Sequence, residues 1–401
     1  MPGTELFGAE EKKEIVDVLE TGVLFRYNHE HLRNNIWKAK DFESEVCKFT
    51  NSRFAHAVSS GSAAVAAALA AAGIGTGDEV IVPPFTFIAT IEAVLFVGAL
   101  PVFADIDETL CLSADGIKKA ISTKTKAVCL VHMCGGMAQM DEIMDVCNEH
   151  NLILVEDAGQ ALGASFNGTK VGLFGAAGSY SFDFFKIATC GEGGVIVTND
   201  ENIYKLVDTY TDHGHDHVGN NRGMENHPIL GFNYRISELH AAIGLAQMRK
   251  VPTVMSSNRK NKAYLINKLQ GINGLGFAKL ADPEGDSATF LNILFDEPDQ
   301  AALFVKNLNE GGIGGFNYWF TNMYHFVNQW NHLKDFHTAS KLPIEILGSP
   351  QDYKSLHIPN AQNVVGRLVS FGIRCTWSKE EMDNLADNIR KCATNAILEL
   401  A

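Results

Sequence analysis

Short apolar runs alternate with helix-length segments through residues 79–198. Five of these runs are almost continuously apolar, which is typical of strands buried on both faces of a sheet. They occupy residues 79–82, 101–104, 127–131, 152–155 and 194–197, while helical composition marks residues 62–72 and 141–150. Strands separated by helices in this way predict a mainly parallel sheet covered on both sides, so the predicted fold class is α/β.

The helical pattern changes beyond about residue 250. Pro252 predicts the end of a helix that begins at Ser237, and a separate helix is expected from Asn258 to Gln270. We therefore predict two domains. They are a large α/β domain with an N-terminal arm over residues 1–255 and a smaller α+β domain over residues 256–401.

Composition and charge narrow the function classes. The chain carries 47 acidic and 33 basic side chains, which gives a formal charge of −14. Such a chain is a poor candidate for binding nucleic acid, because phosphate contacts need clustered Lys and Arg. The longest apolar run, residues 63–75, is shorter than the roughly 20 residues of a bilayer span, and the N-terminus does not resemble a signal peptide. The eight cysteines include no CxxC pair and are typical of reduced thiols. We expect a cytoplasmic protein with neither a nucleic-acid nor a membrane partner.

Two patterns in the α/β half suit ligand binding. Gly61 and Ser62 begin an alanine-rich helix whose first N–H groups suit a phosphate, although ordinary helix capping by Ser62 is the alternative. Asp157 follows the strand at residues 152–155 and is expected at its carboxyl end, where open sheets bind ligands. A carboxylate there binds a ring nitrogen, a ribose hydroxyl or a metal, or it caps the loop.

A lysine and a polar turn complete the set. Lys186 lies in an aromatic segment ahead of a glycine-rich turn, where burial lowers a lysine pKa and leaves the nucleophilic amine of a Schiff base. A lysine that reaches solvent is the alternative. Asn233 and Arg235 either serve a ligand or belong to a turn capped by Ser237. Together these groups fit pyridoxal phosphate, and Phe87 adds an aromatic ring for its pyridine.

Seven motifs between residues 59 and 244 resemble the DegT-type sugar aminotransferases, a branch of the fold-type-I pyridoxal-phosphate enzymes. They are SSGSAAVAAAL, GDEVIVPPFTFIAT, GALPVFADID, EDAGQALGA, SYSF, K-x4-GEGG and GFNYRISELHAAIG. The resemblance implies a large domain with a seven-stranded, mainly parallel sheet, a smaller C-terminal domain, and a homodimer with shared active sites. It also implies a keto sugar as acceptor and glutamate or glutamine as amino donor.

The resemblance further assigns roles to individual residues. Lys186 would form the internal aldimine and later move the proton, and Asp157 would pair with the pyridine nitrogen. The other implied cofactor contacts are Gln160 at the ring hydroxyl, Phe87 on the ring, Gly61, Ser62 and Ser181 at the phosphate, and Asn233 at the phosphate of the neighbouring subunit. One branch of the family has histidine in place of the lysine and dehydrates sugars, so Lys186 favours amino transfer.

The N-terminal stretch ELFGAEEKKEIVDVLETGVLFRYN and the segment DHGHDHVG resemble a subgroup that makes 8-amino-3,8-dideoxy-octulosonate for lipopolysaccharide. Its acceptor would be a sugar acid with an aldehyde at C8; a nucleotide-linked 4-keto-6-deoxy sugar is the alternative. Residues 26–40 carry four Arg or Lys against one Glu, so Arg26 and Arg33 are candidates for binding an anionic substrate. A solvated loop at a dimer edge is the other interpretation.

Other features of the sequence leave further interpretations open. The resemblance places His213 and His215 near the substrate, whereas three alternating histidines could also hold a metal; without a supporting ligand pattern we expect none. The aromatic residues Phe316, Tyr318, Trp319 and Tyr324 pack in the core or contact the sugar. A regulator that binds pyridoxal phosphate without catalysis is the rival function, while a missing GxGxxG motif argues against a nicotinamide oxidoreductase.

Overall fold

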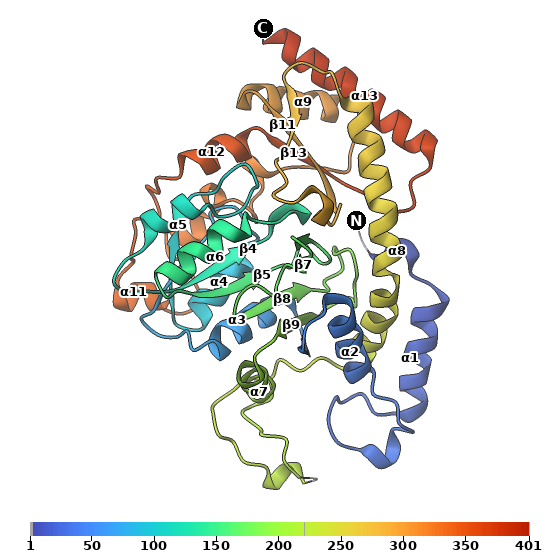
Figure 1. Cartoon of the computed structure of the whole chain (residues 1–401), viewed down its shortest axis with the longest axis vertical. Helices are drawn as coiled ribbons and strands as arrows, with labels where there is room; N and C mark the ends of the chain where they lie inside the picture. Colours follow the sequence, from blue (N-terminus) through green and yellow to red (C-terminus); the bar gives the residue numbers. More distant parts are fainter. Residues whose placement is uncertain (1–2, 220, 401) are drawn as a thin grey trace.

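The computed structural model describes residues 3–219 and 221–400. Its centre is a seven-stranded sheet in the order β1-β9-β8-β5-β4-β2-β3 (Figure 1). The strands are β1 Phe54–Val58, β2 Glu79–Val82, β3 Leu100–Phe103, β4 Thr125–Val131, β5 Ile153–Asp157, β8 Ala177–Ser181 and β9 Gly194–Thr198. The strands from β8 to β3 are parallel, and β9 and β1 pair antiparallel to their neighbours. This confirms the predicted α/β class and its large, mainly parallel sheet.

Two of the seven strands were not predicted. The five strands expected from their apolar runs are present with ends within two residues of the prediction, but β1 reads FAHAV and β8 reads AGSYS. Small and polar residues hide the strand pattern in both. In β8 the small residue is required, because a Cβ at Gly178 would lie 2.3 Å from the Cα of Gly172.

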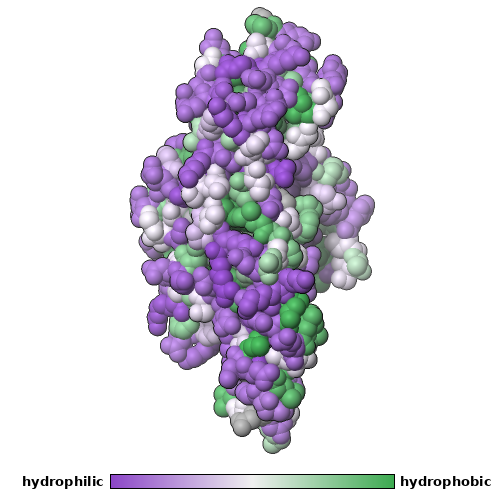
Figure 2. All heavy atoms as spheres, turned by 90° about the vertical axis from the view of Figure 1, so that its right-hand side faces the viewer, coloured by the Kyte–Doolittle hydropathy of each residue, from purple (hydrophilic) through white to green (hydrophobic). Residues whose placement is uncertain are grey.

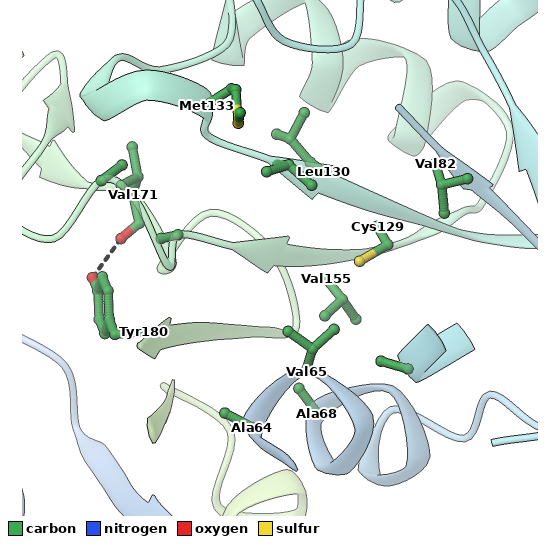
Figure 3. Close-up of a cluster of buried hydrophobic side chains, with 14 of the residues drawn as sticks. Ala64, Val65, Ala68, Val82, Cys129, Leu130, Met133, Val155, Val171 and Tyr180 are labelled. Carbon is green, nitrogen blue, oxygen red and sulfur yellow. Dashed lines mark hydrogen bonds between the residues drawn. The ribbon is translucent and has the colours of Figure 1, made fainter. Parts of the chain in front are cut away.

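Helices cover both faces of this sheet. The alanine-rich helix α3 (Gly61–Ala71) packs on β8, β9 and α4 (Ala89–Phe96), and Val65 and Ala68 point from it toward the sheet on the side of Val155 (Figure 3). Side chains as small as alanine allow the helix to approach the strands closely. Helices α5 (Ala114–Ala120) and α6 (Met140–Glu149) pack on each other, and right-handed crossovers place them on the opposite face.

The helix α8 (Glu238–Leu269) is continuous over 32 residues, so the predicted break at Val251 and Pro252 is wrong. Proline removes one backbone hydrogen bond from a helix. Packing offsets this loss, because α1 (Ala9–Thr21), α2 (Lys38–Thr50) and α13 (Lys379–Glu399) all lie against α8 and Val251 is fully buried. The predicted helix from Asn258 is the second half of α8. The boundary expected after residue 255 therefore falls within one helix, and the division into two domains stays a prediction.

A smaller antiparallel sheet follows α8 in the chain. Its order is β10-β11-β13-β12, with β10 Leu275–Phe277, β11 Phe290–Phe295, β12 Phe316–Tyr318 and β13 Leu368–Gly372. Helices α9 (Pro298–Glu310) and α13 pack on it, and a separate apolar cluster forms there around Phe304, Phe371 and Ile389. This sheet and its helices agree with the α+β structure predicted for the C-terminal part of the chain.

The chain between β12 and β13 returns to the large sheet. It carries α10 (Asn331–Lys334), α11 (Pro343–Leu347) and α12 (Pro359–Gly366). The amide of Gln351 pairs with both backbone groups of Phe103 in the edge strand β3, at 2.7 and 2.9 Å, and the hydroxyl of Tyr353 donates to the carbonyl of Pro101. These contacts cover an edge that would otherwise expose unpaired backbone groups.

The face formed by α1, α8 and α13 is mainly hydrophilic, with separate apolar patches (Figure 2). Within residues 3–219 and 221–400, none of the helices has the length and apolar character needed to cross a membrane.

Candidate active site

A cavity of about 800 Å³ lies between the two sheets. One wall is formed by residues at the carboxyl ends of three parallel strands, Val131 of β4, Asp157 of β5 and Ser181 of β8. Phe290 of β11 and Phe371 of β13 belong to the other wall. The carboxyl edge of an open α/β sheet is where ligands usually bind, so this cavity is the candidate active site.

The N-terminus of α3 opens into the cavity. Ser60 caps the helix, because its hydroxyl accepts the N–H of Ala63 at 3.1 Å; the alternative that Ser62 is the capping residue is therefore wrong. Gly61 and Ser62 line the cavity beside Ser181. A Cβ at Gly61 would lie 2.8 Å from both the Cβ and the Oγ of Ser181, so only glycine fits there without a shift. Free N–H groups and hydroxyls in this arrangement suit a phosphate.

Asp157 and Gln160 are each held by hydrogen bonds. Thr90 Oγ1 donates to Asp157 Oδ2 at 2.8 Å, and the N–H of Gly159 donates to Asp157 Oδ1 at 3.0 Å. Asp157 thus caps its loop, which is one of the predicted alternatives, and it also lines the cavity, while its role toward a ligand stays a prediction. Gln160 Oε1 accepts the N–H of Cys134 at 3.2 Å, which leaves the amide N–H groups of Gln160 as donors.

Lys186 follows β8 and lines the same cavity. Its backbone is fixed on both sides, because its N–H bonds to the carbonyl of Asp183 and its carbonyl accepts the N–H of Gly3. Burial lowers the pKa of Lys186, and the carboxylates of Asp157 and Asp183 oppose this shift without cancelling it. A lowered pKa increases the share of neutral amine, which is the nucleophilic form.

His325 is a cavity residue that sequence analysis missed. It lies beside Phe87, with ring centroids 5.3 Å apart, and beside Trp319, with centroids 4.8 Å apart. Trp319 and Phe316, from the aromatic group expected in the core or at the sugar, also line the cavity. The signal available in the sequence was the position of His325 within that aromatic group, next to Tyr324.

The lining residues fit pyridoxal phosphate. The start of α3 with Gly61 and Ser181 suits its phosphate, Asp157 its ring nitrogen and Lys186 its aldehyde. At Gly159, as at Gly61, the backbone leaves space that a side chain would fill, since a Cβ there would lie 3.1 Å from Asp157 Oδ1. The predicted cofactor residues other than Asn233 are therefore brought into one cavity.

A family model matches residues 7–390, nearly the whole chain. The chain belongs to the DegT/DnrJ/EryC1/StrS aminotransferase family. Membership confirms the family expected from the seven motifs, and it confirms pyridoxal phosphate as the cofactor, on which this family depends.

The curated relatives include proteins named for perosamine synthesis and for polysaccharide biosynthesis. The GDP-perosamine synthase of Vibrio cholerae is 39% identical over 232 residues, which are 58% of this chain and 62% of that relative. The spore coat polysaccharide biosynthesis protein SpsC of Bacillus subtilis is 29% identical over 98% of this chain and 96% of its own. The match with the GDP-perosamine synthases thus spans about three fifths of their length.

Solved structures agree with the family fold. An aminotransferase from Psychrobacter cryohalolentis is 27% identical, with a TM-score of 0.82 over 97% of this chain and 98% of that chain. A GDP-4-keto-6-deoxymannose-3-dehydratase with a trapped PLP-glutamate geminal diamine is 25% identical, with a TM-score of 0.80 over 96% of this chain and 98% of that chain. The fold-type-I prediction is confirmed by these neighbours.

Asn233 is exposed on a turn of this chain and lies outside the cavity. Its Oδ1 accepts the N–H of Arg235, and its backbone forms a bridge with Asp212. Exposed apolar side chains surround the turn in sequence, including Leu230 at 95% and Phe232 at 46% exposure. The geometry keeps Asn233 away from the cofactor residues of its own chain.

Arg26 and Arg33 are buried outside the cavity. Arg26 donates to the carbonyl of Ala57 at 2.5 Å and to Glu43 at 2.7 Å. Arg33 donates to backbone carbonyls and lies 3.3 Å from Glu238. The solvated-loop interpretation is wrong for these two residues, and their guanidinium groups already have partners within the chain.

The histidine segment is held by ion pairs. His217 bonds to Asp208 and Asp212, both at 2.8 Å, and His215 lies 2.9 Å from Glu225. His213 is exposed, and neither it nor His215 lines the cavity, so their substrate roles stay predictions. Among the residues that the structure describes, no cluster of three or more His, Cys, Asp or Glu is placed to hold a metal.

Proposed function

We propose that this chain transfers an amino group from glutamate, or glutamine, to the carbonyl carbon of a sugar. The observation that carries the proposal is the placement of Lys186, with its lowered pKa, in one cavity with Asp157 and the N-terminus of α3. When bound, pyridoxal phosphate supplies the electron sink that lets a proton leave the carbon beside the amino group. The protein has to bind and orient the cofactor and the substrates, and it has to move that proton.

Each cavity residue has a separate task in this reaction. Asp157 is kept facing the cavity by Thr90 and Gly159, so its negative charge can hold the ring nitrogen in the protonated form. Lys186 Nζ can take up and release a proton, and burial makes release easier because it lowers the pKa of the amine. Phe87 provides an apolar surface for the ring and helps to exclude water.

The acceptor that we propose is an 8-oxo-3-deoxy-octulosonate-type sugar acid used for lipopolysaccharide. The N-terminal and DHGHDHVG segments support this choice, as does Arg374, the one arginine among the described lining residues. The guanidinium of Arg374 suits a carboxylate, and the remaining charged lining residues apart from Lys186 are acidic. The names of the GDP-perosamine synthases favour a second candidate, a nucleotide-linked 4-keto-6-deoxy sugar.

We also propose that the enzyme is a homodimer whose partner copy completes the site with Asn233. Phe184 and Phe185 are 49% and 68% exposed beside Lys186, and Leu230 and Phe232 flank Asn233. Large exposed apolar side chains near a cavity mark an association surface, and a twofold axis would exchange the two groups. A cytoplasmic location stays a prediction.

An absorption titration tests the proposal. The purified protein with pyridoxal phosphate is mixed with glutamate and then with each of the two sugars. We expect glutamate to convert the cofactor to its amino form and one sugar to reverse the change. A cofactor spectrum that does not respond to glutamate or glutamine would support the non-catalytic regulator instead. Amination of the nucleotide-linked sugar alone would replace the sugar acid as acceptor.

A further inference from the structure

His325 is held in the active site by its backbone. Its carbonyl accepts the N–H of Thr86 at 3.0 Å, and the carbonyl of Tyr324 accepts the N–H of Ile88 at 2.9 Å. The segment that carries His325 therefore pairs with the segment that carries Phe87, and both line the cavity. The ring of His325 is placed against Phe87 and Trp319, so it is not a mobile surface side chain.

The hydrogen bonds of Asn322 fix the tautomer of His325. The Oδ1 of Asn322 accepts the backbone N–H of Tyr324 at 3.0 Å, which identifies this atom as the oxygen of the amide. The same oxygen lies 2.9 Å from His325 Nδ1. Because an oxygen acceptor needs a donor opposite it, Nδ1 carries the proton. In a neutral imidazole, Nε2 then presents a lone pair.

The imidazole is neutral at physiological pH. Burial and the positive charge of Lys186 lower the pKa of His325 to about 4. Nε2 has no protein hydrogen-bond partner among the described residues, and it is not enclosed away from the cavity. The cavity that Lys186 lines thus contains a fixed acceptor, which an O–H or N–H donor of a ligand would satisfy.

We propose that His325 Nε2 accepts a hydrogen bond from the sugar hydroxyl on the carbon next to the reacting carbonyl. The inference rests on the proposed sugar aminotransferase function. The ring of His325 lies 5.3 Å from the ring of Phe87, the proposed surface for the cofactor ring, and both line the same cavity as Lys186. The carbonyl carbon has to reach Lys186 beside the cofactor, so a substituent one carbon away is the group that we place within reach of the imidazole. Both candidate acceptors carry a hydroxyl there, at C7 beside the C8 aldehyde or at C3 beside the 4-keto group. His325 would select such acceptors over deoxy analogues.

The kinetic test compares two sugars and three proteins. The two sugars are 8-oxo-3-deoxy-octulosonate and its 7-deoxy analogue. If the enzyme uses the GDP-linked 4-keto sugar, they are that sugar and its 3-deoxy analogue. We expect kcat/KM to be roughly ten- to hundredfold higher for the sugar that carries the hydroxyl. His325→Phe keeps a ring and should lose this preference, whereas His325→Gln keeps an acceptor and should recover part of it. Met323→Leu, an exposed neighbour, is the control. An unchanged preference in His325→Phe overturns the proposal.

Two further measurements separate this inference from the function itself. The glutamate half-reaction involves no sugar, so its absence in the unmodified enzyme overturns the proposed function instead; the control Met323→Leu should retain it. Calorimetry of the holoenzyme with 3-deoxy-octulosonate, whose C8 alcohol cannot react, reports binding alone. The affinity should be constant between about pH 5.5 and 8, because the imidazole stays neutral. Tighter binding as the pH falls would indicate an imidazolium donor and overturn the proposal.

Discussion

The backbone of Gly61 lies against the side chain of Ser181, so that a Cβ at Gly61 would come within 2.8 Å of the serine Cβ and Oγ. This contact joins the start of α3 to the end of β8, which brings the N–H groups proposed to bind the phosphate next to the strand that leads to Lys186. The close approach depends on a missing side chain and not on a left-handed backbone, because Gly61 is part of a helix.

We expect Gly61→Ala to weaken cofactor binding. The added methyl group must displace Ser181, which costs about 1–3 kcal/mol and moves two of the proposed phosphate contacts. Pyridoxal phosphate affinity should fall roughly tenfold or more, measured by titration of the cofactor-free protein. Gly75→Ala is the matched control, because a Cβ there meets nothing closer than 4.0 Å. Equal cofactor affinity in both variants would contradict the phosphate assignment.

Lys186→Ala should abolish the visible absorption of lysine-bound cofactor and lower amino transfer by at least about 10³-fold. The other residues proposed to hold the phosphate and the ring are unchanged, so the variant should bind pyridoxal phosphate without the covalent link. Absorption spectra and a cofactor titration measure the two effects separately. Lys170→Ala is a control, because the pKa of Lys170 is also lowered by burial but its amine bonds to Gly163 outside the cavity. A surviving band in Lys186→Ala would move the covalent link to another amine.

The sequence pattern was informative where local residues decide the structure. The apolar runs predicted the strand that ends at Asp157, and the order of the motifs predicted that Gly61 and Lys186 lie in the same site. The sequence pattern failed where contacts between residues far apart in the chain determine the structure. Pro252 does not end α8 because other helices hold it, and Arg33 is buried because Glu238 faces it from the start of that helix. His325 enters the site through backbone pairing with Thr86, which no local pattern in either segment encodes.

Arg33→Met tests whether this residue serves the substrate or the fold. The change removes the partner of buried Glu238, and an unpaired buried charge costs about 3–5 kcal/mol. We expect the free energy of unfolding in urea to fall by that amount, with an unchanged KM for the sugar in the folded fraction. Lys40→Met, in the same segment but exposed, should leave stability nearly unaltered. A raised KM at unaltered stability would instead support the predicted role of Arg33 in substrate binding.

Arg374→Gln tests the anionic acceptor. Arg374 is half exposed at the cavity, and its Nε lies 3.5 Å from Glu5 Oε1. Loss of a charge-assisted pair should raise the KM for the sugar acid about tenfold, while the glutamate half-reaction keeps its rate. Steady-state kinetics with each substrate varied in turn separate the two. Equal losses in both half-reactions would contradict a role of Arg374 confined to the acceptor, and a loss in the glutamate half-reaction alone would assign it to the amino donor.

His217 should make the stability of the enzyme depend on pH above neutrality. Burial alone lowers its pKa, but the hydrogen bonds and charges of Asp208 and Asp212 outweigh burial and raise the pKa to about 9. A group whose pKa is raised on folding stabilises the folded protein fully below its unfolded pKa of about 6.5, and this contribution is lost as the pH rises through about 9. The urea concentration at the midpoint of unfolding should therefore decrease as the pH rises from 7 to about 9. His217→Gln should remove most of this pH dependence and should lower the stability at pH 7. Exposed His240→Gln provides the control. If both variants kept the slope of the unmodified enzyme, another group would have to titrate in this range.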